Sequence, residues 1–362
     1  MDTGDTLGGR YRLVELVGVG GMGEVWRATQ LALGREVAIK LLYRDRWAPG
    51  AQHTPVAVME ERFRREASLI AKVRHRNVVD VIDFGTTDDG THFLVMPFLV
   101  GETLEQRMGR EPAPNVQELR LLFDGVLAGL GAIHDAGVIH RDLKPANIFL
   151  VRDADGVVPT LLDFGISREE ERAPKSSQLT HEGAMMGTPH YMAPEQFESA
   201  RTADRRADLY GVGAMLYEAF AGKVPYAGND PFAVYRAILE GSAQPLGQLR
   251  PDLPLALLHV IERALASDPD HRFSDARSMR AALAQALTLG DGASGRLSTR
   301  PDGNAPTALA SSIPPAPRVP AFETPVPQNG SSHSGVAAAP KPKRRGVLWA
   351  GAALALVGAG FG

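Results

Sequence analysis

The chain has no cysteine among its 362 residues, and this absence removes several classes of site. Disulfide bonds, thiolate metal centres and cysteine nucleophiles are excluded, and a reducing compartment is compatible with the composition. An excess of one charge is also missing, because 39 Lys and Arg face 42 Asp and Glu. This balance gives no indication of nucleic-acid binding or of adsorption of the whole chain to a membrane surface. Residues Met1–Gly9 have no basic start followed by an apolar run, so no secretory signal is expected.

The middle of the chain carries two short motifs with charged and amide side chains at fixed offsets. Residues His140–Asn147 read HRDLKPAN, and residues Asp163–Gly165 read DFG. The first motif offers an aspartate that can orient a hydroxyl, a lysine that can meet a moving phosphate, and an asparagine oxygen. The second motif adds a carboxylate for magnesium. These are the groups that phosphoryl transfer needs.

A glycine-rich segment fits the pattern G-x-G-x-x-G-x-V over Gly18–Val25. Glycine allows the backbone to approach phosphate oxygens, although many loops need glycine only to turn. The alternative is a dinucleotide-binding fold, in which the third glycine opens a helix. Residues Glu24–Thr29 have the composition of a strand, which favours a strand–loop–strand flap over phosphates.

Lys40 lies near the end of a predicted strand. A lone lysine in a strand is usually a solvated edge charge, but Ala38 lies on the same face and is small enough to contact an adenine ring. A lysine that points into a cleft needs a counter-ion, which keeps it protonated. Glu66, on a predicted amphipathic helix, is the best candidate, and Glu60 and Glu61 are the alternatives.

Apolar patterning predicts strands in the first third of the chain and mostly helices after it. The expected strands are Tyr11–Val17, Glu24–Gln30, Glu36–Leu42, Val78–Phe84 and Thr91–Met96, and apolar stripes place helices over Phe63–Val73, Leu119–Ile133 and Leu209–Phe220. This order predicts an α+β fold of two lobes with a cleft between them. Along the chain we expect an N-terminal tail (residues 1–10), a folded domain (11–289), a linker (290–345) and an apolar run (346–362). The Pro, Ala, Gly and Ser content of the linker predicts disorder.

Taken together, these motifs resemble those of the eukaryotic-like (Hanks-type) Ser/Thr protein kinases of bacteria, over about Leu7–Leu289. The resemblance implies a bilobal protein kinase fold that transfers the γ-phosphate of ATP to Ser or Thr hydroxyls of protein substrates. It implies Mg²⁺ as the metal, with Mn²⁺ as an alternative. Asp142 would accept the hydroxyl proton, Lys144 would stabilise the γ-phosphate, and Asn147 and Asp163 would hold magnesium.

The resemblance also implies a nucleotide site between the lobes. Met96 would be the gatekeeper and Pro97–Leu99 the hinge. Pro97 replaces the usual glutamate, but it keeps its carbonyl, and Leu99 supplies the N–H that the hinge needs. The residues expected to bind the nucleotide are Val17, Gly18, Val19, Gly20, Gly21, Met22, Gly23, Glu24, Val25, Ala38, Lys40, Glu66, Met96, Pro97 and Leu99.

The polar segment between Asp163 and Glu195 is expected to be an activation loop, with Ser176, Ser177 and Thr180 as candidate acceptors. Thr180 falls where similar kinases carry an activating phosphothreonine. Because the arginine before the base binds this phosphate in the family, the resemblance implies autophosphorylation of Thr180 and a contact with Arg141.

Two further features of the resemblance concern the scaffold. Glu195 is expected to pair with Arg272, and Asp208 to brace the catalytic loop from inside a long helix. The lysine at position 144 and the segment Gly187–Glu195 are typical of Ser/Thr kinases rather than tyrosine kinases.

Two other functions stay open. A pseudokinase has the same fold and acts as a scaffold, although every motif position is intact here. A small-molecule kinase is disfavoured because the segment ending in Ala193–Glu195 is typical of a platform for a protein substrate. A homodimer through the small lobe is common in the family, but the sequence has no signature for it.

The apolar run Gly346–Gly362 carries no charge and follows the basic cluster Lys341–Arg345. A membrane-spanning helix needs about 20 residues, with a lower limit of about 17. Because Lys and Arg beside a span stay in the cytoplasm, we expect a single-pass protein of the cell membrane with a cytoplasmic kinase domain. A weakly associating tail on a cytoplasmic protein is the alternative. Many similar kinases carry an extracellular sensor, so the chain is either a fragment or a tail-anchored kinase.

Overall fold

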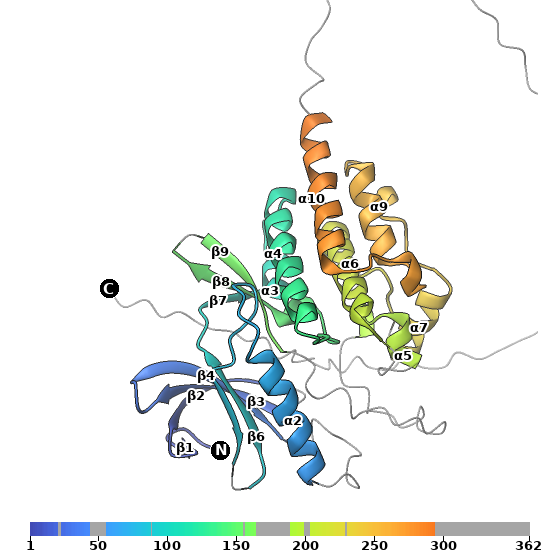
Figure 1. Ribbon diagram of the computed structural model, residues 1–362. Helices are drawn as coiled ribbons and strands as arrows, with labels where there is room; N and C mark the ends of the chain where they lie inside the picture. The colour runs from blue at the N-terminus through green and yellow to red at the C-terminus, as the bar shows by residue number, and fades with distance from the viewer. Residues whose placement is uncertain are drawn as a thin grey trace, which may run out of the picture. The chain divides into compact units, whose positions relative to one another are not determined.

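The N-terminal part of the chain forms an antiparallel sheet with the strand order β1-β2-β3-β4-β6-β5 (Figure 1). The computed structural model describes residues 1–20, 23–43, 56–87, 89–154, 156–163, 189–198, 203–228 and 230–293, without the side chains of residues 56–60, 62, 66 and 288–293. The strands of this sheet are β1 (Thr6–Leu7), β2 (Tyr11–Val19), β3 (Gly23–Gln30), β4 (Arg35–Leu42), β5 (Asp83–Thr86) and β6 (His92–Pro97). Helix α2 (Val56–Ile70) lies beside the sheet (Figure 1).

Alternation along β4 gives the sheet two different faces. Val37, Ile39 and Leu41 have no exposed surface and belong to the apolar cluster of one face. The other members of this cluster are Leu7, Tyr11, Leu13, Trp26, Ala28, Phe93 and Val95. Because successive residues of a strand point to opposite faces, Ala38 and Lys40 lie on the other face, where they line a cavity with residues of the C-terminal part.

The C-terminal part is built on long helices that lie side by side (Figure 1). These are α4 (Val116–Asp135), α6 (Arg205–Ala221), α9 (Leu255–Ala264) and α10 (Ala276–Ala293). They share one buried cluster, to which Phe123, Leu209, Ile261 and Met279 each contribute from a different helix. The shorter helices are α3 (Leu104–Met108), α5 (Pro194–Glu198), α7 (Pro231–Leu239) and α8 (Leu246–Leu249), with 3₁₀ turns η2 (Pro145–Asn147), η3 (Pro189–Tyr191) and η4 (Pro269–His271). A small antiparallel sheet joins β7 (Gly101–Thr103), β8 (Ile148–Asp153) and β9 (Gly156–Leu161).

Helix α6 is buried on nearly every side, which differs from the single apolar stripe that the sequence predicts. It begins after Asp204, whose carboxylate accepts a hydrogen bond from the N–H of Arg206 at 2.8 Å. It ends at Gly222, whose φ of 70° is a left-handed conformation that glycine adopts easily. Asp208 is only 2% exposed in the first turns of this helix. A carboxylate in such a place must find its partners inside the protein.

The predicted strand Val78–Phe84 is wrong for most of its length. Only Asp83 and Phe84 join β5, while Val78 makes a single parallel bridge with Leu161. Val78, Val79 and Val81 are buried in the main cluster, so their apolar pattern reflects an extended core segment and not strand pairing. The other predicted strands and helices occur as elements with somewhat different ends.

The C-terminal predictions fall mostly beyond the described part of the chain. Helix α10 continues to Ala293, past the domain end predicted at Leu289. Within the described residues, no helix combines the length and the apolar character that a membrane crossing requires. The rest of the predicted linker and the apolar run Gly346–Gly362 lie outside the described residues.

Candidate active site

An apolar cavity lies between the β2–β3–β4 face and residues of the C-terminal part. Its lining consists of Val17, Val25, Ala38, Lys40, Met96, Pro97, Phe98, Leu99, Phe149, Leu162 and Asp163. Most of the side chains predicted to contact a nucleotide base are therefore brought together. A cavity with apolar walls and a few charged groups can hold a flat ring and leave an attached anion near the charges.

The glycine-rich segment is a flap between two paired strands, and it does not open a helix. β2 and β3 pair antiparallel, with Gly18 opposite Val25. The N–H of Gly20 donates to the carbonyl oxygen of Gly23 at 2.8 Å. A Cβ on Gly23 would lie 1.8 Å from the carbonyl oxygen of Leu41, so no other residue fits without moving the backbone. The dinucleotide-binding alternative is thereby excluded.

Several flap residues predicted to bind the nucleotide do not line this cavity. Gly18, Val19, Gly20 and Gly23 belong to the flap, and Gly21 and Met22 lie outside the described residues.

The side chain of Glu24 is engaged elsewhere. Its carboxylate accepts hydrogen bonds from the indole N–H of Trp26 at 3.0 Å and from the hydroxyl of Tyr43 at 2.8 Å. Trp26 belongs to the buried cluster on the opposite face of the sheet from the cavity.

Lys40 forms an ion pair with Asp163 across the cavity. The distance from Lys40 Nζ to Asp163 Oδ1 is 2.6 Å, and the lysine side chain is only 15% exposed. The solvated edge charge that we considered as an alternative is therefore wrong. Asp163 has a φ of 53°, a left-handed conformation that few non-glycine residues adopt. The predicted partner Glu66 lies on α2, but its side chain is not among the described atoms.

The catalytic-loop motif gathers its polar side chains around Asp142. Lys144 Nζ lies 3.1 Å from Asp142 Oδ2, and Asn147 Nδ2 donates to the carbonyl oxygen and to Oδ2 of Asp142 at 2.8 and 3.1 Å. The Asp142 side chain is 14% exposed, so it keeps access to a group arriving from outside. The N–H of Leu162 donates to the carbonyl oxygen of Asn147 at 2.9 Å, which joins this loop to the residue before Asp163.

Asp208 holds the backbone of the catalytic loop from inside α6. Its two carboxylate oxygens accept hydrogen bonds from the N–H groups of His140 and Arg141 at 2.9 and 2.8 Å. The ring of His134, on α4, lies 2.8 Å from the same carboxylate. Burial alone would raise the pKa of Asp208, but the hydrogen bond and charge of His134, with the contribution of His140, outweigh burial and lower this pKa. The predicted bracing role of Asp208 is confirmed.

Glu195 and Arg272 form the predicted scaffold pair. Two parallel hydrogen bonds of 2.7 and 2.8 Å join the guanidinium to the carboxylate, and the arginine side chain has no exposed surface. Arg272 also donates to the carbonyl oxygens of Ala266 and Ser267 and lies over the ring of Tyr210. This pair anchors helix α5 to the segment before α10.

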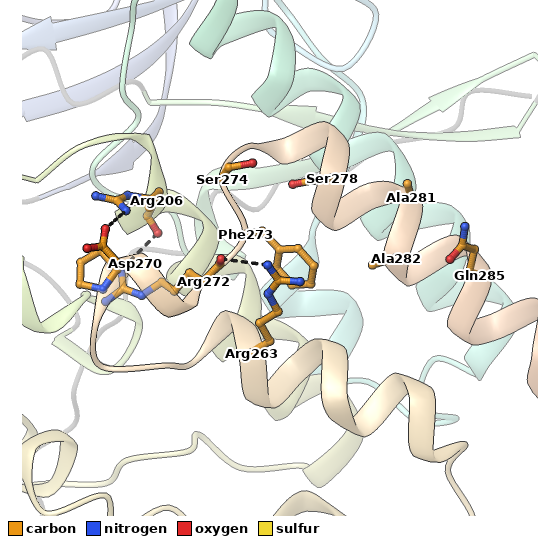
Figure 2. A pocket seen from close by; sticks show the side chains of 11 residues that line it. Arg206, Arg263, Asp270, Arg272, Phe273, Ser274, Ser278, Ala281, Ala282 and Gln285 are labelled. Atoms are coloured by element: carbon orange, nitrogen blue, oxygen red, sulfur yellow. Dashed lines mark hydrogen bonds and ion pairs between the residues drawn. The ribbon is translucent and has the colours of Figure 1, made fainter.

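A second cavity, of about 430 Å³, opens beside this scaffold pair. Figure 2 shows Arg206 turned toward Asp270 and the guanidinium of Arg263 near Phe273. None of its lining residues carries a predicted catalytic or nucleotide-binding role. The predicted nucleotide-binding side chains therefore line the first cavity and not this one.

The donor set for a metal fits magnesium with a nucleotide. Among the described residues, no group of three or more His, Asp or Glu could hold a metal ion alone. Asn147 turns its Nδ2 to Asp142, which leaves Oδ1 as the atom that can meet a cation. Mg²⁺ prefers oxygen ligands and is usually held by one or two protein side chains together with phosphates and water. Asn147 and Asp163 each carry a side-chain oxygen of this kind, so they fit as ligands of a magnesium ion that nucleotide phosphates also hold.

The predicted regulatory hydroxyls Ser176, Ser177 and Thr180 lie outside the described residues. Their expected partner Arg141 is described, and its backbone has a φ of 63° directly before Asp142.

Sequence reasoning missed four residues that the structure brings to the site. Phe149 and Leu162 complete the apolar lining of the cavity. His134 meets the bracing carboxylate, and Gln196 contacts the catalytic loop. Each of these four residues lies within a few positions of a recognised motif or contacts such a motif from a helix. The sequence alone does not show that they meet at the site, because the fold brings them there.

The model of the family described as "Protein kinase domain" matches residues 11–286 of the chain. The chain is similar to serine/threonine-protein kinase pkn2 of Myxococcus xanthus, with 40% identity over 284 residues, 77% of this chain and 33% of that protein. It is 37% identical to the probable serine/threonine-protein kinase PknB of Corynebacterium glutamicum over 281 residues, 76% of this chain and 42% of that protein. The chain thus spans half or less of the length of these curated relatives.

Solved structures agree with these matches. The crystal structure of the PknI kinase domain of Mycobacterium tuberculosis resembles the chain with a TM-score of 0.60 and 28% identity, over 79% of this chain and 99% of that one.

We predict that Asp208→Asn lowers the free energy of unfolding by about 2–3 kcal/mol at pH 7, because hydrogen bonds to a charged group are lost. The lowered pKa of Asp208 means that its stabilising effect is present above the unfolded pKa of about 3.9 and disappears as the pH falls through the lower folded value. The stability difference between wild type and variant should therefore shrink in acid. Urea unfolding at pH 7, 5 and 3.5 measures it.

The control is Asp80→Asn, which removes an exposed ion pair with Arg74 and should change stability little. A difference between wild type and Asp208→Asn that stays constant over the whole pH range would contradict the account of Asp208.

Proposed function

The chain belongs to the protein kinase family, and we propose that it transfers the γ-phosphate of ATP to Ser and Thr hydroxyls of protein substrates. The names of its curated relatives, which are bacterial serine/threonine-protein kinases, support this substrate class. Since the chain spans only part of their length, the activity of the whole relatives is carried over here as a proposal.

One observation carries the proposal: Asp142 contacts both Lys144 and Asn147. The carbonyl oxygen of Asn147 in turn accepts a hydrogen bond from the N–H of Leu162, and the next residue, Asp163, pairs with Lys40. The residues proposed to orient the hydroxyl, to supply positive charge and to bind the metal are therefore connected by a chain of direct contacts. Phosphoryl transfer requires positioning and charge stabilisation more than covalent chemistry, and this set provides both.

Asp142 would accept a hydrogen bond from the substrate hydroxyl and take its proton as the oxygen attacks. Its contact with Lys144 keeps a positive charge beside the position where the γ-phosphate moves. The hydroxyl oxygen forms a bond to the γ-phosphorus and its proton passes to Asp142, while the bond from the γ-phosphorus to the β,γ-bridging oxygen breaks and ADP leaves.

The apolar cavity would hold the adenine ring between Val25, Ala38 and Leu162, with the carbonyl of Pro97 and the N–H of Leu99 at its edge. Lys40 would hold the α- and β-phosphates. Asn147 and Asp163 would hold Mg²⁺, or Mn²⁺ as an alternative, which when bound neutralises phosphate charge.

Regulation is proposed from the sequence together with Arg141. Phosphate on Thr180 would pair with the guanidinium of Arg141, whose backbone Asp208 holds. Ser176 and Ser177 are further acceptors. The resemblance to bacterial kinases also supports a homodimer.

Membrane attachment is proposed on the sequence alone. The uncharged run Gly346–Gly362 after the basic cluster Lys341–Arg345 would place the kinase domain on the cytoplasmic side.

We predict that Asp142→Asn lowers phosphate transfer about a hundredfold or more, because the loss of a general base costs about 10²–10⁴-fold. Incorporation of labelled phosphate from ATP and Mg²⁺ into a mixture of Ser and Thr peptides measures this for the full chain. Asp153→Asn, at an exposed position, should behave as wild type. If the Asp142→Asn variant transferred phosphate as fast as the wild type, the assignment of Asp142 as the base would be wrong.

The same assay separates the two alternatives. A wild-type chain that binds ATP but transfers no phosphate to any acceptor would be a pseudokinase. Transfer to small alcohols and not to peptides would identify a small-molecule kinase.

We predict that Thr180→Ala lowers the rate of peptide phosphorylation about tenfold, the equivalent of one charge-assisted hydrogen bond. Mass spectrometry should find phosphate on Thr180 of the wild type and none in Asp142→Asn. Thr3→Ala, at an exposed position of the N-terminal tail, is the matched control and should keep the wild-type activity. Equal activity and equal loop phosphorylation in Thr180→Ala would show that Thr180 has no regulatory role.

A further inference from the structure

The carboxamide of Gln196 is buried between helix α5 and the catalytic loop. The residue is 4% exposed. Its Nε2 donates to the carbonyl oxygen of Arg141 at 3.0 Å, and its Oε1 accepts from the N–H of Ala193 at 3.0 Å. One side chain therefore connects the catalytic loop, next to the base Asp142, with the start of the segment that Glu195 anchors.

The backbone of Arg141, which Gln196 contacts, has a conformation that needs stabilising hydrogen bonds. Arg141 has a φ of 63°, a left-handed conformation that an L-residue adopts only at a cost in free energy. Asp208 accepts the N–H of Arg141 at 2.8 Å, and Gln196 donates to its carbonyl oxygen. Arg141 is therefore held on both sides, by a carboxylate at its donor and by a carboxamide at its acceptor.

Water has little room to replace this contact. The cavity that Gln196 shares with Arg141, Asp142 and Asp208 has a volume of about 10 Å³. Such a space holds one water molecule at most. If the carboxamide is removed, the carbonyl of Arg141 loses the Gln196 donor in a partly buried place, and the conformation with positive φ loses the support that this hydrogen bond gives.

We propose that Gln196 is a positioning residue for the base Asp142, and that it makes the orientation of the base depend on the docked segment Ala193–Glu195. The proposal rests on the proposed phosphotransfer function. The N–H of Ala193 orients the carboxamide that donates to the Arg141 carbonyl, so docking of Ala193–Glu195 and orientation of the base are coupled.

The chemistry of the two ends of the carboxamide offers a specific test. Glutamate at this position keeps an oxygen for the N–H of Ala193. When ionised, it places a second oxygen against the carbonyl of Arg141, and the two acceptors repel. When protonated, it can donate to that carbonyl as the amide does. The variant Gln196→Glu should therefore recover activity as the pH falls, whereas Gln196→Leu has no donor at any pH.

The experiment compares kcat and KM of the full chain for ATP and for the best peptide acceptor between pH 5.5 and 8. We expect Gln196→Leu to lower kcat about tenfold at every pH, with the KM for ATP unchanged, because the partly buried hydrogen bond to Arg141 is lost. Because position 196 is buried, and burial raises the pKa of a carboxyl group, we expect the ratio of kcat of Gln196→Glu to that of wild type to rise about tenfold from pH 8 to pH 5.5.

Matched controls are Gln248→Leu and Gln248→Glu, at an exposed position on α8, which should follow the wild type throughout. Circular dichroism confirms that each variant is folded at the assay temperature. If Gln196→Leu does not fold, the pH dependence of Gln196→Glu alone decides. A constant kcat ratio for Gln196→Glu, or a change in KM for ATP in place of kcat, would overturn the proposal. An inactive wild type would instead refute the proposed function.

Discussion

The constraint on which the site depends is a buried carboxylate in the most enclosed helix of the fold. Asp208 cannot reach solvent from α6, so it takes the N–H groups of His140 and Arg141 and the ring of His134 as its partners. These contacts hold Arg141 at a φ of 63°, and this turn presents Asp142, Lys144 and Asn147 together. The catalytic loop has little regular structure of its own, so its geometry is set by the helix behind it.

The second half of the site comes from the sheet, and the two halves meet at Asp163. β4 directs Ala38 and Lys40 to the cavity because Val37, Ile39 and Leu41 occupy the opposite, buried face. Lys40 then pairs with Asp163, and the residue before Asp163 is hydrogen-bonded to Asn147. Glu195 and Arg272 anchor helix α5, from which Gln196 reaches the Arg141 carbonyl. Groups distant in sequence are thus joined by short chains of direct contacts, which keeps the reacting positions rigid.

Motif spacing predicts most of this arrangement, and it fails where burial or long-range pairing decides. Ala38 and Lys40 share a face because the strand period is two, and Glu195 and Arg272 carry opposite charges at recognisable motif positions. The apolar run around Val79 reads as a strand, but burial in the core produces the same pattern without a ladder. The contacts of Lys40 with Asp163 and of Gln196 with Arg141 could not be predicted, because no local rule states which side chains meet across the fold.

The measurement that tests the account most directly is the turnover of Asp208→Asn, compared with its nucleotide affinity at a temperature where the variant is folded. Asp208 does not line the nucleotide cavity and binds the backbone of the two residues before Asp142, so we expect its effect to pass through the orientation of Asp142. We expect kcat to fall about a hundredfold, the cost of a small misplacement of a catalytic group, while the dissociation constant for ATP changes less than about threefold. A folded Asp208→Asn protein with wild-type kcat would contradict the claim that this carboxylate positions the base.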